Sequence, residues 1–118
     1  MRLTSALCAG LLLLALASHA AAHSLLLDSS PAAGSTVAAP AQLMVRFNNR
    51  IEKALSRLRL VDERGEAQRL STPVSDGPAD RLTVALPPLA PGAYRVEWQV
   101  LSTDGHIVSG RFSFRVAP

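Results

Sequence analysis

The sequence predicts an all-β domain, a seven-stranded Greek-key β-sandwich or barrel of the immunoglobulin-like type. Large apolar and polar residues alternate from Tyr94 to Val100, and the alternation returns from Arg111 to Val116. A period of two is typical of a strand with one buried face. Turn-forming residues separate several shorter stretches of this kind, and no stretch has a helical period of useful length.

Three strands are expected in the first part of the domain. Residues 24–30 form a Leu-rich strand that ends at Pro31, and the small residues up to Pro40 form a loop. Residues 42–47 alternate and direct three side chains inward, namely Leu43, Val45 and Phe47. Residues 56–62 also alternate, with Leu58 and Leu60 inward and Val61 outward. Between these two strands, residues 51–54 form either a single helical turn or an irregular crossing.

The second part of the domain continues the pattern. A turn at residues 63–66 leads to a short strand at 67–71, and the loop of residues 72–80 follows. Residues 81–86 alternate again, and a Pro-rich connection precedes the strand that begins near Tyr94. The last two strands are joined by a turn that contains Asp104-Gly105, a strong turn signal.

The N-terminal segment has the features of a secretory signal peptide. One Arg is followed by a Leu- and Ala-rich run that ends in Ala20-Ala21-Ala22. A transmembrane helix needs about 20 apolar residues, and this run is shorter, so we weigh a retained anchor as the lesser alternative. We therefore expect residues 1–22 to be removed and residues 23–118 to form one domain in the periplasm, not embedded in the membrane.

Composition limits what this domain does. The cysteine at position 8 belongs to the signal peptide, so the domain has no disulfide and depends on packing for its stability. The formal net charge of the chain is +3, and its arginines are scattered along strand faces beside acidic residues. A nucleic-acid-binding protein needs clustered cations interleaved with aromatic residues. We interpret the charges as solvated strand faces and expect no nucleic-acid partner.

Two histidines remain after cleavage, His23 and His106, and both are candidate metal ligands. Cleavage after Ala22 makes His23 the first residue, so its α-amine and its ring nitrogen can chelate one metal ion. His106 adds a third nitrogen, and Asp104 adds a carboxylate oxygen. Three nitrogens and one oxygen suit Cu(II), which stands at the top of the divalent affinity order. The residues alone leave open a simple polar turn without a metal.

The sequence resembles the CopC family of periplasmic copper-binding proteins. The resemblance covers the mature chain: an N-terminal His23, Ser-Pro-Ala-x-Gly-Ser at residues 30–35, and a strand that ends at Phe47. It continues with Gly-x-Tyr-x-Val-x-Trp-x-Val-x-Ser-x-Asp-Gly-His at residues 92–106 and Gly-x-Phe-x-Phe-x-Val at residues 110–116. It implies the sandwich fold and one Cu(II) per monomer, bound by the amine and imidazole of His23, the imidazole of His106 and the carboxylate of Asp104.

The resemblance also implies a role and a partner. It suggests a non-enzymatic carrier or buffer that sequesters periplasmic Cu(II) in copper resistance or homeostasis. A CopD-like inner-membrane copper protein would receive the metal. Because all ligands must be deprotonated to bind, copper binding should be lost as the pH falls.

The sequence departs from the family pattern at two places. Many members carry a Met-rich loop with His that binds Cu(I), but residues 65–78 contain neither residue type. Met44, the one methionine of the mature chain, is assigned to packing. We therefore expect no separate Cu(I) site. Asn49 lies where the family often has a Glu near the copper site. If that Glu orients a copper ligand, its carboxylate is missing here.

Two other classes of function remain as alternatives. An N-terminal His with a second His also resembles the histidine brace of copper-dependent polysaccharide monooxygenases. Such enzymes need open coordination positions and an aromatic surface, whereas the few aromatic residues here are expected to point inward. The second alternative is a metal-free interaction module, because β-sandwiches serve many unrelated functions.

Overall fold

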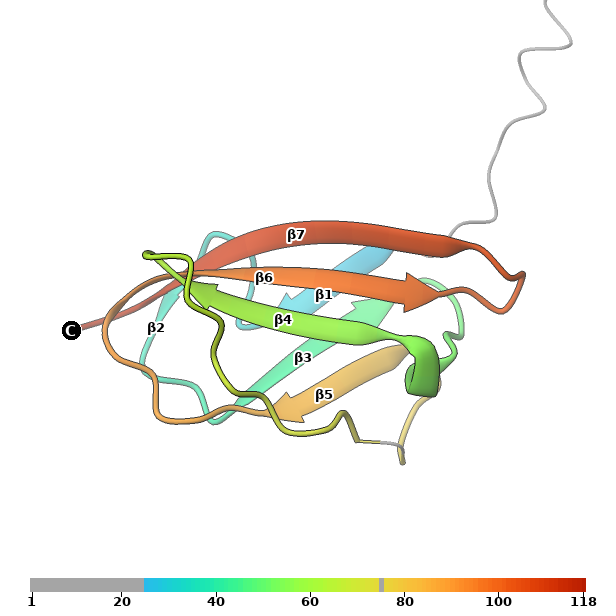
Figure 1. The fold of residues 1–118 in the computed structure, drawn as a ribbon, viewed down its shortest axis with the longest axis horizontal. Coiled ribbons are helices and arrows are strands. Elements are labelled where there is room, and N and C mark those ends of the chain that lie inside the picture. Colours follow the sequence, from blue (N-terminus) through green and yellow to red (C-terminus); the bar gives the residue numbers. More distant parts are fainter. Residues whose placement is uncertain (1–24, 75) are drawn as a thin grey trace, which may run out of the picture.

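The computed structural model describes residues 25–74 and 76–118, and it shows two β-sheets packed face to face (Figure 1). The described residues form seven strands and one short 3₁₀ helix, η1. These are β1 (Leu26–Ser30), β2 (Thr36–Val37), β3 (Gln42–Phe47), η1 (Lys53–Leu55), β4 (Arg57–Asp62), β5 (Arg81–Ala85), β6 (Gly92–Leu101) and β7 (Ile107–Val116). The predicted class, an all-β sandwich of seven strands, is confirmed.

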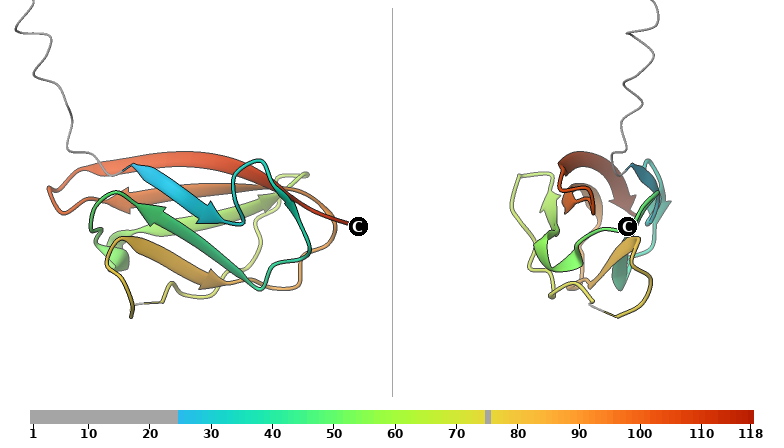
Figure 2. Two further views of the ribbon diagram at one scale, coloured as in Figure 1. Left: turned by 180° about the vertical axis from the view of Figure 1, so that it is seen from behind. Right: turned by 90° about the vertical axis from the view of Figure 1, so that its right-hand side faces the viewer.

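The chain passes repeatedly between the two sheets. One sheet has the order β1-β3-β5, and the other has the order β2-β7-β6-β4. Only the β6–β7 connection joins two neighbouring strands of one sheet, and every other connection crosses to the opposite sheet (Figure 2). This interleaving of the strands is typical of Greek-key sandwiches. It means that neither sheet can form without the other.

Two local expectations were wrong. The loop predicted between Pro31 and Pro40 contains β2, which pairs in parallel with the end of β7. Residues 67–71 form no strand and contribute a single bridge between Val61 and Ala67. Val61 pairs with the exposed Arg95 and so lies on the outward face as expected, although it is buried. The N–H of Gln68 donates to the carbonyl of Leu60, so the chain after the turn lies along the edge of β4 at this point. The crossing at residues 51–54 leads into the single turn of η1.

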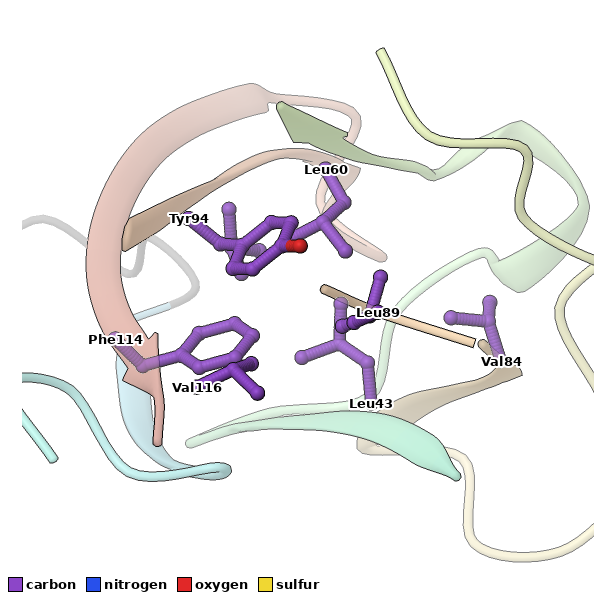
Figure 3. Packing of buried hydrophobic residues seen from close by; sticks show 8 residues of the cluster. Leu43, Leu60, Val84, Leu89, Tyr94, Phe114 and Val116 are labelled. Carbon is purple, nitrogen blue, oxygen red and sulfur yellow. The ribbon is translucent and has the colours of Figure 1, made fainter. Parts of the chain in front are cut away.

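The alternating residues meet in a continuous layer between the sheets. Seven of them, from β3, β4, β5, β6 and β7, form the cluster shown in Figure 3 together with Leu89 of the β5–β6 connection. Within it the rings of Tyr94 and Phe114 stack with centroids 5.8 Å apart. The Tyr94 hydroxyl donates to the carbonyl of Ala90 at 2.6 Å. Burial is the main cause that raises the pKa of this hydroxyl above its ordinary value.

A second cluster fills the half of the sandwich that contains the β6–β7 turn. Its members are Val45, Phe47, Ile51, Leu82, Trp98 and Val100. The rings of Phe47 and Trp98 meet edge to face, with centroids 5.1 Å apart, which joins the two sheets. Trp98 pairs with Gly110 on the neighbouring strand, and its ring covers the position that a Gly110 side chain would occupy. The missing side chain therefore makes room for the indole.

The first strand is held against β3 by backbone pairing and by one ion pair. Arg46 donates from Nε and Nη2 to the two carboxylate oxygens of Asp28, at 3.0 and 2.9 Å. These hydrogen bonds are the largest cause that holds the pKa of Asp28 below its ordinary value. Such a two-point contact fixes the relative position of the two strands better than a single bond.

We expect Gly110→Ala to destabilise the fold. The added methyl group would overlap the Trp98 ring, and overpacking of this kind costs about 1–3 kcal/mol of unfolding free energy. Urea unfolding followed by the fluorescence of this single tryptophan measures the change. Ser109→Ala, at the adjacent outward position, serves as the control and should leave the midpoint nearly unchanged. Equal midpoints for the two variants would contradict this account of Gly110.

We expect Arg46→Met to raise the pKa of Asp28 toward the ordinary carboxyl value. Because the folded-state pKa is lowered, the contribution of this pair to stability is present above the unfolded-state value and is lost as the pH falls through the folded-state value. An NMR titration of the Asp28 carboxyl carbon measures the shift. Arg69→Met removes an exposed arginine elsewhere and should not move it.

Candidate metal centre

The turn between β6 and β7 has a defined backbone that positions Asp104 and His106. The N–H of Ser102 donates to the carbonyl of His106 at 2.8 Å, and the N–H of Gly105 donates to the carbonyl of Ser102 at 2.9 Å. Gly105 has φ +88°, a left-handed conformation that favours glycine. The Asp-Gly signal therefore has its expected role, since the turn requires a glycine at this position.

Two hydrogen bonds join Asp104 to His106. Oδ1 of Asp104 accepts from the backbone N–H of His106 at 3.2 Å, and Oδ2 lies 3.1 Å from Nδ1 of the imidazole. A carboxylate oxygen accepts a hydrogen bond at this contact, so the neutral tautomer that fits it carries the hydrogen on Nδ1 and the lone pair on Nε2. This pairing is the usual means by which a carboxylate orients a metal-binding histidine. The geometry therefore fits a histidine ligand whose Nε2 points away from Asp104.

The pair is open to solvent. The side chain of His106 is 63% exposed and that of Asp104 is 35% exposed. Both side chains make further interactions beyond this pair, as does Ser102. Among residues 25–74 and 76–118, no three side chains of the His, Cys, Asp and Glu types gather into a metal-binding group. The described part of the chain thus supplies two candidate donors, one imidazole nitrogen and one carboxylate.

Asn48 fixes where the N-terminal part of the chain enters the sandwich. Its Oδ1 accepts from the N–H of Leu25 at 2.7 Å, and its own N–H donates to the carbonyl of Leu25 at 2.9 Å. The residue therefore acts as a clamp at the end of β3, directly after Phe47. Sequence reasoning singled out Asn49 and did not identify Asn48. The signal for Asn48 was its position after an alternating strand, where an amide often pairs with a neighbouring backbone.

The clamp and the Asp104–His106 turn lie at the same end of the sandwich. From Asn48 the chain crosses in three residues to Ile51, which bridges to Ser102 at the start of the turn. The N–H of Glu52 then donates to the carbonyl of Leu101 at 2.9 Å. Figures 1 and 2 show β1 beginning at the end of the molecule where the β6–β7 turn projects. The chain therefore enters the fold at the end of the sandwich that carries the candidate donors.

Three further residues were named in the sequence analysis, and their positions are as follows. His23 lies outside the described residues. Asn49 is exposed, and its amide nitrogen lies 3.4 Å from Oδ1 of Asn48, so it contacts the clamp. Met44 is half-buried on β3, pairs with Thr83 and Ser30, and is remote from the turn in the strand register.

Within the described residues, none of the helical structure is long and apolar enough to pass through a lipid bilayer.

Comparisons with known proteins agree with this architecture. Residues 26–117 match the family model of the CopC domain. Copper resistance protein C of Escherichia coli is 32% identical over 122 residues, which cover 97% of this chain and 97% of the relative. Copper transport protein CutJ of Bacillus subtilis is 33% identical over 100 residues, which cover 80% of this chain but only 18% of that longer protein.

A solved structure gives the same result. The crystal structure of CopC from Methylosinus trichosporium OB3b superposes with a TM-score of 0.76 at 39% sequence identity, over 81% of this chain and 95% of that one. The family match spans nearly all of the described residues, and the solved structure has the same fold. The chain therefore belongs to the CopC family, and its function is related to copper.

Proposed function

We propose that the chain is a periplasmic Cu(II)-binding protein that sequesters copper and hands it to a partner, without catalysing a reaction. One Cu(II) would be bound per monomer by the amine and imidazole of His23, the imidazole of His106 and the carboxylate of Asp104. The observation that carries the proposal is the Asp104–His106 pair, joined at 3.1 Å at the end of the sandwich where the chain enters at Leu25.

The reach of the chain supports a contribution from His23. Two residues of extended chain span at most about 7 Å. Leu25 is clamped by Asn48, and the crossing from Asn48 leads to Ile51 and its bridge to Ser102. A first residue at position 23 would therefore start within about 7 Å of Leu25, at the end of the sandwich that carries the turn. An N-terminal histidine is a chelating ligand by itself, because its α-amine and its ring nitrogen belong to one residue.

The donor set suits Cu(II). Nitrogen and carboxylate oxygen are the ligands that this ion prefers in tetragonal sites, whereas thioethers select Cu(I). Residues 65–78 contain no Met or His, so we propose no separate Cu(I) site. Asp104 has two compatible roles: it can ligate the metal directly, or it can orient the His106 ring as it does in the hydrogen-bonded pair.

A carrier is favoured over a histidine-brace monooxygenase by the aromatic residues. Phe47 and Phe114 are 1% exposed, and Tyr94 and Trp98 are also buried, so the described residues offer no aromatic platform for a glycan. The relatives described above are named as copper resistance and copper transport proteins. A CopD-like inner-membrane protein is the proposed acceptor, and the signal peptide of residues 1–22 would deliver the chain to the periplasm.

Adding one residue before His23 should weaken Cu(II) binding by orders of magnitude, because the amine would leave the chelate. Competitive titration against a chelator measures the affinity, and spin-resonance spectroscopy counts the nitrogen donors. The matched control carries the same extra residue after Pro118 and should bind as the native chain does. Unchanged affinity in the N-terminal variant would exclude the amine, as would an exported chain that begins at another residue.

His106→Ala should remove one nitrogen donor and lower the affinity at least about tenfold. Asp104→Asn separates the two roles of the carboxylate. If Asp104 ligates the metal, the spin-resonance parameters should shift while the count of nitrogen donors stays the same. If it only orients His106, the parameters should change little. Glu63→Gln, at the opposite end of the sandwich, is the control, and a His106→Ala variant with native affinity would contradict the proposed site.

A further inference from the structure

The outward face of the β4–β6–β7 sheet gathers arginines that are far apart in the sequence. Strand alternation directs Arg57, Arg59, Arg95, Arg111 and Arg115 to this face, and all five are exposed. The pairing register places Arg59 beside Glu97 and Glu97 beside Arg111, with Arg57, Gln99 and Ser109 in the next row. We call these five residues the arginine face. It belongs to the sheet nearer the reader in Figure 1.

One acidic side chain lies among these arginines. Glu97 contacts Nη1 of Arg59 at 3.3 Å and Nη2 of Arg95 at 3.8 Å. The other three arginines form no ion pair within the described residues; these are Arg57, Arg111 and Arg115. Elsewhere in the described residues acidic side chains outnumber basic ones. The charges that look scattered in the sequence are therefore concentrated by the fold on one side of the molecule.

The arginine face also contains a hollow. This hollow of about 300 Å³ is bordered by the polar side chains of β4, β6 and β7 and also lined by Leu58, Trp98 and Gly110; the polar residues are Arg57, Arg59, Glu97, Gln99 and Ser109. Guanidinium groups bind carboxylates through two parallel hydrogen bonds, and they do so at interfaces more readily than lysine ammonium groups. All the cations of this face are arginines, whereas the one lysine of the chain, Lys53, belongs to η1.

We propose that the arginine face is a docking surface for a protein that presents a cluster of Asp and Glu side chains. Charge complementarity is the basis for this choice, because five arginines against one glutamate attract an acidic surface and repel a basic one. The proposal does not require that copper be bound, so its failure would leave the proposed copper site intact.

A protein is favoured over an anionic membrane by the side chains around the arginines. Surface binding to lipid usually combines cations with apolar side chains that enter the bilayer. The outward positions of β4, β6 and β7 are mainly Arg, Ser, Gln and Glu.

The test uses the exported chain and a synthetic oligoglutamate peptide as the probe. NMR titration should shift backbone amides of β4, β6 and β7 on the outward positions, and added salt should reverse the shifts. The double variant Arg57→Glu with Arg111→Glu should weaken binding at least about tenfold. The control, Arg50→Glu with Arg69→Glu, makes the same change in net charge at exposed positions outside the face and should keep most of the affinity.

Three results would overturn the proposal. The first is equal loss of binding in both double variants, which would mean that only net charge matters. The second is a set of amide shifts that maps outside β4, β6 and β7. The third is binding to phosphatidylglycerol vesicles with no binding to the peptide, which would assign the face to a membrane. Glu97→Gln adds a test of opposite sign: it removes the competing carboxylate and should strengthen binding to the peptide.

Discussion

Burial of the inner face of the β6–β7 hairpin is the constraint on which the rest of the structure depends. Each strand has ten residues, and every second side chain enters the sandwich, with Val96 and Val100 fully buried and Phe114 nearly so. A shift of the register by one residue would bring Arg95, Gln99 and Ser113 into the places of these three side chains. The register is therefore fixed, and it fixes in turn the place of Asp104 and His106 at the end of the hairpin.

The candidate metal centre needs a second constraint, because its donors come from distant parts of the chain. The start of β1 is placed by its pairing with β3, by the Asp28–Arg46 contact and by the Asn48 clamp on Leu25. The crossing from Asn48 to Ile51 then ties the end of β3 to Ser102. The edge-to-face contact of Phe47 and Trp98 lies behind this crossing and holds the two sheets together there. A site at this end thus rests on packed side chains rather than on loops alone.

The fold was predictable wherever a strand has one buried and one solvated face. Strands β3, β5, β6 and β7 follow from alternation alone, because burial enforces a period of two. The prediction missed β2, since two residues show no period and their pairing with β7 is set by a distant strand. It assigned a strand to residues 67–71, where local composition favoured extended chain but only one bridge to Val61 forms.

The candidate donors could be singled out from local sequence features, whereas the contacts that support them could not. Asp104 and His106 were found from turn chemistry and from the scarcity of histidine, both of which are local features of the sequence. Asn48 was missed because its contact with Leu25 depends on the register of β1 against β3, which no local pattern encodes. The arginines were expected on solvated strand faces, where they lie, but their gathering on one face was not predicted, since only the pairing of β4, β6 and β7 brings them together.

The arginine face extends along the strands toward the end of the sandwich that carries the proposed copper site. The row of Arg57, Gln99 and Ser109 lies two residues from the Leu101–Ile107 pair that begins the turn. A partner that docks on this row would therefore sit beside Asp104 and His106 without a change in the fold. The attraction would come from charges outside the proposed coordination sphere, which would leave the candidate copper ligands open to exchange. Under the proposed function, separate surfaces for attraction and for coordination would let a partner stay docked while the metal changes its ligands.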